Sequence, residues 1–125
     1  MNVTVGNDII EVERIKDLVQ NSDLKALNRI YTDKEIKYCE DKKNMKYQHY
    51  AARFAAKEAV FKAISPILKN KFVIGFRNIE VINDDMGRPY VNLLSNDVNH
   101  RNIQIDISMS HIKEYAIATA VVKIK

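Results

Sequence analysis

The order of hydrophobic and polar residues divides the chain into a mainly helical first half and a strand-rich second half. Near the start, the β-branched residues of segment 3–6 predict a short strand. Apolar residues at helical spacing then predict a helix over 12–20 and a shorter helix over 24–30. The chain is therefore expected to begin with one strand that is followed by helices.

Two further helices are predicted before the middle of the chain. Thr32 and Glu35 have the spacing of a capping box, in which each side chain bonds the amide of the other residue, and this predicts a helix through to Glu40. The strongest helical segment is 44–64, which contains six alanines and neither Gly nor Pro. Pro66 is expected to end it.

The second half has the patterns of strands. Segments 79–82 and 90–93 predict two strands on either side of a turn at 83–89. Apolar and polar residues alternate over 103–107, and segment 115–122 predicts a last strand. We therefore expect one α+β domain over all 125 residues, with an antiparallel sheet packed against one long helix and several short helices.

The distribution of charge points to an anionic partner. The net charge is +4, but segment 25–77 carries 13 Lys and Arg residues against 5 Asp and Glu residues. Such a stretch suits nucleic acid, a phosphorylated small molecule or an acidic protein, and a solvated lysine-rich surface is the plain alternative. A single cysteine, Cys39, and the lack of a signal peptide or an apolar membrane span predict a cytoplasmic protein with no membrane partner.

On the long helix, Glu58 lies at the edge of the face that we expect to be buried. A helical wheel centred on Phe54 shows an aromatic stripe within about 40° of that residue. Its members are Tyr47, Tyr50 and Phe61. Glu58 also falls about 40° from the centre, and a buried carboxylate is costly unless it is paired or binds a metal. An intrahelical pair with Lys62, four residues later, is the alternative explanation.

Asp8 is a second unusual acid, because it lies among apolar residues. Val5 precedes it closely, and Ile9 and Ile10 follow it. We expect this carboxylate at a strand end, facing into the structure, and a cap on the following helix is the alternative. Two carboxylates from different elements suit Mg²⁺, which usually takes one or two protein carboxylates together with substrate phosphates and water.

A polar cluster over 108–115 follows the alternating strand and contains hydroxyls, His111 and Lys113. Two interpretations are open: a turn that contacts phosphate, and an ordinary polar hairpin loop. The chain has no Ser-His-Asp signature, no Gly-rich phosphate loop and no zinc-ligand spacing.

Four motifs then occur in order along nearly the whole chain. They are Gly6-Asn7-Asp8-Ile9-Ile10-Glu11-Val12-Glu13-Arg14-Ile15, Tyr50-Ala51-Ala52-Arg53-Phe54-Ala55-Ala56-Lys57-Glu58-Ala59, Gly87-Arg88-Pro89 and Ser108-Met109-Ser110-His111. Together they resemble the bacterial holo-acyl-carrier-protein synthases, the small class of 4′-phosphopantetheinyl transferases. The helical motif is the most specific of the four.

The resemblance implies an enzyme of fatty acid biosynthesis. Members of this family move the 4′-phosphopantetheine group of coenzyme A to a serine of apo-acyl carrier protein and release adenosine 3′,5′-bisphosphate. They require Mg²⁺ and typically form homotrimers whose active sites lie between subunits. The implied partners are therefore acyl carrier protein, coenzyme A and further copies of the chain, and not nucleic acid.

The resemblance also implies roles for individual residues. Asp8 and Glu58 match the metal-binding carboxylates and, with Lys62 near the pyrophosphate, the catalytic residues. Coenzyme A contacts are implied for Arg53, Lys62, Ser110 and His111. Arg14 matches a basic position that faces the acidic carrier protein, and Lys25 is a further candidate for that contact.

The segment after the long helix departs from the family pattern. Where relatives usually have a Gly-rich stretch, this chain has Ala63-Ile64-Ser65-Pro66-Ile67-Leu68-Lys69-Asn70-Lys71, in which Lys69 and Lys71 are candidates to supply charge in place of glycine amides. Two rival interpretations stay open from the sequence. One is a basic module that binds RNA or DNA, and the other is a scaffold that has kept the fold without activity.

Overall fold

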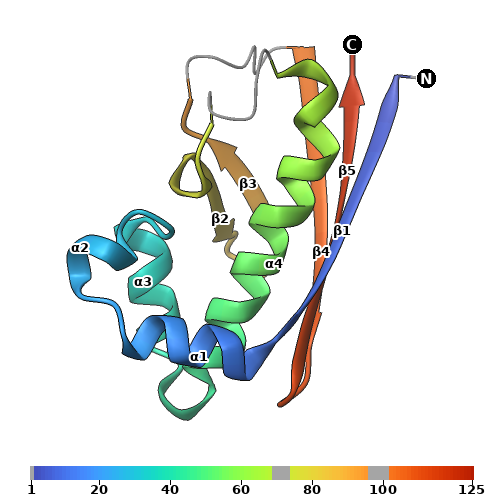
Figure 1. Cartoon of the computed structure of the whole chain (residues 1–125). Helices are drawn as coiled ribbons and strands as arrows, with labels where there is room; N and C mark the ends of the chain where they lie inside the picture. Colours follow the sequence, from blue (N-terminus) through green and yellow to red (C-terminus); the bar gives the residue numbers. More distant parts are fainter. Residues whose placement is uncertain (1, 69–73, 96–101) are drawn as a thin grey trace.

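Three long antiparallel strands form the main sheet of the protein (Figure 1). The computed structural model describes residues 2–68, 74–95 and 102–125. The strands are β1 (Val3–Glu11), β4 (Ile103–His111) and β5 (Tyr115–Ile124), and they lie in the order β1-β5-β4. Strands from the beginning and the end of the sequence are therefore neighbours in the sheet.

The long helix α4 packs along one face of this sheet, and in Figure 1 it lies between the sheet and the smaller helices α2 and α3. Within the described residues, the α-helices are α1 (Val12–Gln20), α2 (Leu24–Leu27), α3 (Asp33–Glu40) and α4 (Lys46–Ile64). Short 3-10 helices are η1 (Lys43–Met45), η2 (Ser65–Ile67) and η3 (Phe76–Asn78).

A β-hairpin completes the described structure. Its strands are β2 (Ile79–Asn83) and β3 (Pro89–Leu93), paired antiparallel. In the turn, the Asp84 carboxylate accepts hydrogen bonds from the amides of Met86 and Arg88, both at 2.9 Å. Gly87 has φ +83°, a left-handed conformation that glycine adopts without a Cβ clash.

One buried ion pair joins α3, α4 and the hairpin. Lys57 Nζ lies 2.7 Å from Glu35 Oε1, and both side chains are fully buried. The Lys57 ammonium also donates to the carbonyl oxygens of Phe76 and Ile79. The Glu35 carboxylate accepts hydrogen bonds from the amides of Thr32 and Val81. The capping box predicted for α3 is therefore present, and its glutamate also holds α4 and β2.

Small side chains let α4 approach the sheet closely. The fully buried face of the helix includes Ala55, Ala56, Ala59 and Ala63. The facing positions of β5 are Ala116, Ala118 and Ala120. The prediction that the aromatic stripe around Phe54 forms the centre of the buried face is wrong, because the alanine side faces the sheet and Phe54 lies half-buried beside it.

The opposite face of the sheet is exposed and apolar along β1 and β5. Val5 and Ile9 on β1 are 62% and 64% exposed, and Ile117 and Val121 on β5 are 44% and 41% exposed. On β4, the four residues on this face are all polar, and they are Gln104, Asp106, Ser108 and Ser110. An exposed apolar surface of this kind is typical of a protein interface.

The predicted α+β architecture and antiparallel pairing are confirmed, and α1 has the predicted bounds. Two expectations about strand ends are wrong. Strand β1 continues past Gly6 to Glu11, and segment 108–111 belongs to β4 and is not a turn. Both differences arise from pairing with β5, whose long ladder extends each neighbour.

Candidate active site

Asp8 and Glu58 line one pocket of about 410 Å³ between β1, α1 and α4. Asp8 faces α4 because it lies on the same face of β1 as Gly6 and Ile10, two residues from each. It therefore lies inside the strand, which contradicts the expectation of a strand end. The alternative of a helix cap is also wrong, since α1 has Glu11 at its N-cap position without a side-chain hydrogen bond.

The pocket is a poor environment for a second negative charge. Burial raises the pKa of Glu58, the negative charge of Asp8 raises it further, and the ammonium of Lys62 opposes both effects. A pair of carboxylates that repel each other in a partly buried site has a high affinity for a positive ion. The acids predicted from distant segments are thus brought together by the fold.

Lys62 pairs with Asp8. Its ammonium lies 3.3 Å from Asp8 Oδ1 and donates to the carbonyl oxygen of Asn7 at 3.0 Å. No ion pair joins Glu58 to Lys62 within the described residues, so the intrahelical pair considered from the sequence is not formed. The lysine instead reaches from α4 back to β1.

Arg14 and an apolar wall complete the same pocket. Arg14 is exposed on α1 at its rim, and Ile15, Leu18 and Phe54 supply apolar surface beside the carboxylates. The helical spacing of positions 15 and 18 is visible in the sequence, but their place beside Glu58 is not. Lys25 is exposed on α2 and does not line this pocket.

Arg53 belongs to a second pocket, of about 400 Å³, between α3, α4 and the hairpin. Its guanidinium is buried, packs 3.9 Å above the ring of Tyr38 and donates to Asn83 Oδ1 at 2.5 Å. Its Nε has no hydrogen-bond partner within the described residues. Lys34 and Lys42 line the same pocket, and so do Asp84 and Asp85, so it combines three cationic side chains with two acidic ones.

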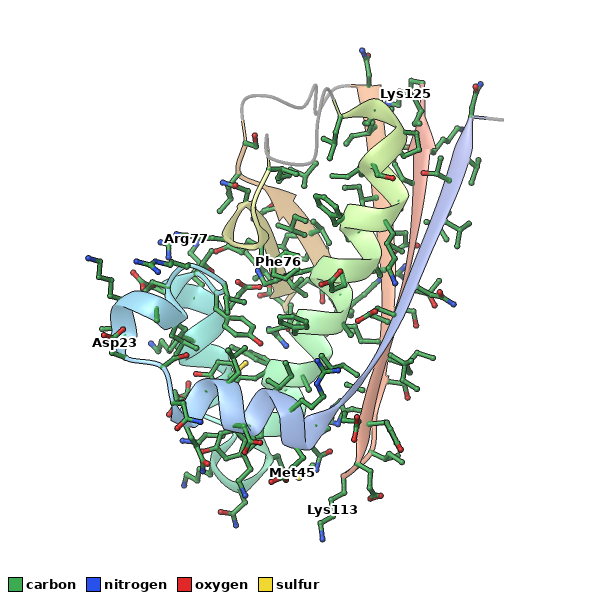
Figure 2. All side chains as sticks on the ribbon, viewed as in Figure 1. Asp23, Met45, Phe76, Arg77, Lys113 and Lys125 are labelled. Atoms are coloured by element: carbon green, nitrogen blue, oxygen red, sulfur yellow. The ribbon has the colours of Figure 1, made fainter. Side chains whose placement is uncertain are left out.

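His111 lies at the end of β4, next to the start of α4. Figure 2 shows both regions at one end of the molecule, where Lys113 and Met45 are labelled. His111 Nδ1 is 2.8 Å from Gln48 Oε1, and its ring packs edge-on against His49 with centroids 4.9 Å apart. Burial lowers the pKa of His111.

The structure thus separates the predicted site residues into groups. Asp8, Glu58, Lys62 and Arg14 surround the first pocket and its edge. Arg53 lies in the second pocket, and Ser110 points to the outer face of the sheet, away from α4 and opposite to His111. Lys69 and Lys71 lie outside the described residues.

Three contacts of these residues were not foreseen from the sequence. They involve the carbonyl of Asn7 with Lys62, the side chain of Asn83 with Arg53, and the side chain of Gln48 with His111. A backbone carbonyl has no signature in a sequence. The two amide side chains lie 30 and 63 residues from their partners, so only the folded chain reveals them.

The donor set limits the kind of metal that this site can hold. Among the described residues, no group of three or more His, Cys, Asp or Glu could hold a metal ion. Two carboxylates are nevertheless sufficient for Mg²⁺, which completes its shell with water and substrate phosphates. The described helices include none that is long and apolar enough to cross a membrane.

Comparison with known proteins gives a consistent result. Residues 4–120 match the model of the 4′-phosphopantetheinyl transferase superfamily. Holo-(acyl-carrier-protein) synthase of Ruminiclostridium cellulolyticum is 43% identical, with 99% of this chain and 94% of that protein covered. The enzyme of the same name from Clostridium tetani is 38% identical, with 98% and 97% covered.

Solved structures agree with the sequence relatives. A holo-(acyl-carrier-protein) synthase from Bacillus anthracis in complex with CoA (3′,5′-ADP) has a TM-score of 0.76 at 32% identity, over 98% of this chain and 96% of that chain. One from Helicobacter pylori in complex with coenzyme A has a TM-score of 0.79 at 32% identity, over 95% and 99%. The chain therefore belongs to the 4′-phosphopantetheinyl transferase superfamily and, within it, to the holo-(acyl-carrier-protein) synthases, which confirms the resemblance seen in its motifs.

Proposed function

We propose that the protein transfers the 4′-phosphopantetheine group of coenzyme A to a serine of apo-acyl carrier protein in the cytoplasm. Adenosine 3′,5′-bisphosphate is the leaving group, and the modified carrier protein serves fatty acid biosynthesis. One observation carries the proposal: Asp8 and Glu58, from distant segments, line one pocket beside Lys62. The names of the relatives and their coenzyme A complexes support the choice of substrates.

Asp8 and Glu58 fit a magnesium ion. Both are carboxylates at an open pocket, and the raised pKa of Glu58 reflects a site that resists further negative charge. The ammonium of Lys62 against Asp8 shows that this carboxylate accepts a cation as its neighbour. A bound magnesium ion would neutralise charge on the diphosphate of coenzyme A.

Lys62 is suited to the leaving phosphate. Phosphoryl transfer builds negative charge on the leaving oxygens, so catalysis depends mainly on positioning and on cations close to them. The ammonium of Lys62 is half-exposed at the edge of the pocket, at the end of a long side chain. Its charge therefore reaches the substrate without a costly rearrangement of the fold.

The pocket of Arg53 is suited to a phosphate group of coenzyme A. The three cationic side chains of this pocket, Arg53, Lys34 and Lys42, outnumber its two acids, Asp84 and Asp85. The buried guanidinium also has an Nε without a hydrogen-bond partner among the described residues, and this combination favours a compact anion. His111 and Ser110, at the end of β4, are assigned further coenzyme A contacts. These residues do not share the pocket of Asp8 and Glu58, so one chain alone offers two separate parts of a site.

A homotrimer would bring those two parts together. Ile9 neighbours Asp8 on β1, lines the carboxylate pocket and also belongs to the exposed apolar face of the sheet. A neighbouring copy that covers this face therefore lies directly beside the metal-binding acids. In this arrangement the carboxylates of one subunit and the Arg53 pocket of another act on the same coenzyme A molecule.

The basic rim of the carboxylate pocket is suited to bind the acidic carrier protein. Arg14 lines the pocket that also contains Glu58, and Lys25 adds charge on the neighbouring helix α2. Complementary charge of this kind speeds the encounter of two proteins more than it strengthens the final complex.

A mass measurement tests the proposed function. The protein is incubated with coenzyme A, Mg²⁺ and apo-carrier protein, and the carrier is expected to gain one phosphopantetheine group. Asp8→Asn and Glu58→Gln should lose turnover that excess Mg²⁺ restores only in part. Glu13→Gln, an exposed acid on α1, is the matched control.

Two results would contradict the proposal. One is an unmodified carrier with the native protein, accompanied by retention of nucleic acid, which favours the basic binding module. The other is near-normal turnover of both carboxylate variants at an unchanged metal requirement. Two peaks of carrier protein, with and without the added group, make partial activity directly visible.

A further inference from the structure

A cation already occupies one side of the carboxylate site, and it belongs to the protein. Lys62 Nζ lies 3.3 Å from Asp8 Oδ1 and 3.0 Å from the carbonyl oxygen of Asn7. The Asp8 side chain is only 18% exposed, whereas that of Lys62 is 52% exposed. The lysine is therefore the mobile partner of the pair, and the aspartate is the fixed one.

The ammonium of Lys62 occupies a position where it competes with a metal ion for the same oxygen atoms. A carboxylate oxygen and a backbone carbonyl are both ligands that hard cations prefer. Glu58 lies one helical turn before Lys62 on the same side of α4, so its carboxylate also feels the lysine charge. A divalent cation bound by Asp8 and Glu58 would repel an ammonium in direct contact with Asp8.

We propose that Lys62 is the resident counter-ion of Asp8 in the metal-free protein and that a divalent cation must displace it. This inference rests on the proposed function, since it uses the same carboxylates. Once displaced, the ammonium is free to turn towards the diphosphate of coenzyme A. Binding of the metal and release of the lysine are then one coupled event.

The coupling has a consequence for affinity. In the absence of coenzyme A, the native protein must break the Lys62–Asp8 pair before it binds a metal ion, so its affinity for the free ion is lowered. The pair is partly exposed, and such pairs are worth up to about 1 kcal/mol, which corresponds to about fivefold in a dissociation constant. Removing the lysine charge should therefore strengthen metal binding while it impairs turnover.

The experiment measures the affinity for Mn²⁺ alone, by electron paramagnetic resonance of the free ion, without coenzyme A. Lys62→Met should bind Mn²⁺ about two- to fivefold more tightly than the native protein. Lys37→Met removes an equal charge from an exposed position on α3 and should leave the affinity unchanged. Asp8→Asn should bind weakly with or without Lys62→Met, because the shared oxygen is lost.

A second measurement follows the lysine itself. In protein with ¹³C-methylated lysines, the signal that is absent from Lys62→Arg should shift when Mg²⁺ is added. If Lys62→Met binds Mn²⁺ no more tightly than the native protein, or if the Lys62 signal does not respond to the metal, the inference is overturned. The proposed function is not affected by either result. Lack of metal binding by every protein, with coenzyme A also present, would overturn the proposed metal site as well.

Discussion

Gly6 on β1 lies against the backbone of Ala59 on α4 with no space for a side chain between them. A Cβ atom at position 6 would overlap the carbonyl oxygen of Ala59 and lie 2.9 Å from the amide nitrogen of Ala63. Asp8 follows Gly6 by two residues on the same face of the strand, and Glu58 precedes Ala59 on the helix. The closest contact between strand and helix therefore lies next to the two acids.

Replacing Gly6 with alanine should damage both the fold and the site. The neighbouring atoms are backbone, which cannot move aside without shifting α4 along the sheet. We expect Gly6→Ala to lower the free energy of unfolding by about 3 kcal/mol, at the upper end of the usual cost of overpacking. Chemical denaturation measures this loss, and Mn²⁺ binding should weaken at the same time.

Gly75→Ala is the matched control for that substitution. A Cβ there would meet only Asn78 Oδ1 at 3.5 Å, an ordinary contact, and Gly75 is exposed. Its stability should stay within about 0.5 kcal/mol of the native value. Equal losses in both variants would mean that the close approach of β1 and α4 is not what positions Asp8.

The buried Lys57–Glu35 pair should be far more sensitive to the loss of one partner than to the loss of both. Lys57→Met leaves a buried carboxylate without its counter-charge, and this should cost about 3–5 kcal/mol. Glu35→Gln combined with Lys57→Met removes both charges and should recover part of that loss. Urea unfolding of the two single variants and the double variant gives the coupling energy directly, and strictly additive losses would contradict an ionic pair.

Elements with a strong local signal were predictable from the sequence. The bounds of α1 follow from the helical spacing of Ile15, Leu18 and Val19, and the capping box at Thr32 starts α3 as expected. Strand ends were less predictable, because Asp8 and Ser110 lie in strands only through their pairing with β5. Local sequence does not record a partner strand more than 100 residues away, such as that of Asp8.

In the site, too, some features were predictable from the sequence and others depended on the fold. Asp8 and Glu58 stood out as acids among apolar residues, and the fold places both in one pocket. The helical wheel predicted the wrong centre for the buried face of α4, since it gave weight to the aromatic residues and not to the alanines. Close packing against Gly6 favours small residues, and that preference appears only when strand and helix are considered together.

His49 should make the protein less stable in mild acid. Burial, the largest cause, and the nearby charges of His111, Arg53 and Lys42 together lower its pKa from 6.5 to about 4. Between pH 6.5 and about 4, the unfolded chain binds a proton at this residue and the folded chain does not. The free energy of unfolding therefore falls as the pH is lowered through this window.

The variant His49→Phe should show a smaller fall in stability across the same window. His111 also has a pKa lowered by burial, so the variant keeps part of the slope. The measurement is urea unfolding at several pH values from 7 to 4. An identical pH dependence in the variant and the native protein would show that His49 is free to take up its proton in the folded state.

Asn83 should act through Arg53. It accepts a hydrogen bond from the buried guanidinium and also donates to the carbonyl of Gly87, so it links the second pocket to the hairpin turn. In the proposed reaction, Asn83→Ala should raise the KM for coenzyme A by about tenfold, the lower end of what one lost hydrogen bond to a charged group costs, with little change in kcat. Asn92→Ala, on the other strand of the hairpin, is the control, and equal effects of the two would contradict a specific link to Arg53.

Arg14 should govern the encounter with the carrier protein more than the chemical step. Because it is exposed at the rim of the carboxylate pocket, its attraction for an acidic partner is screened by salt over about 8–10 Å. The KM for carrier protein is therefore expected to rise with ionic strength, and Arg14→Gln should raise it at low salt and flatten its salt dependence while kcat changes little. Lys125→Gln removes an equal charge at the opposite end of the molecule and should leave both unchanged (Figure 2). A KM that is independent of salt in the native protein would exclude electrostatic steering by this surface.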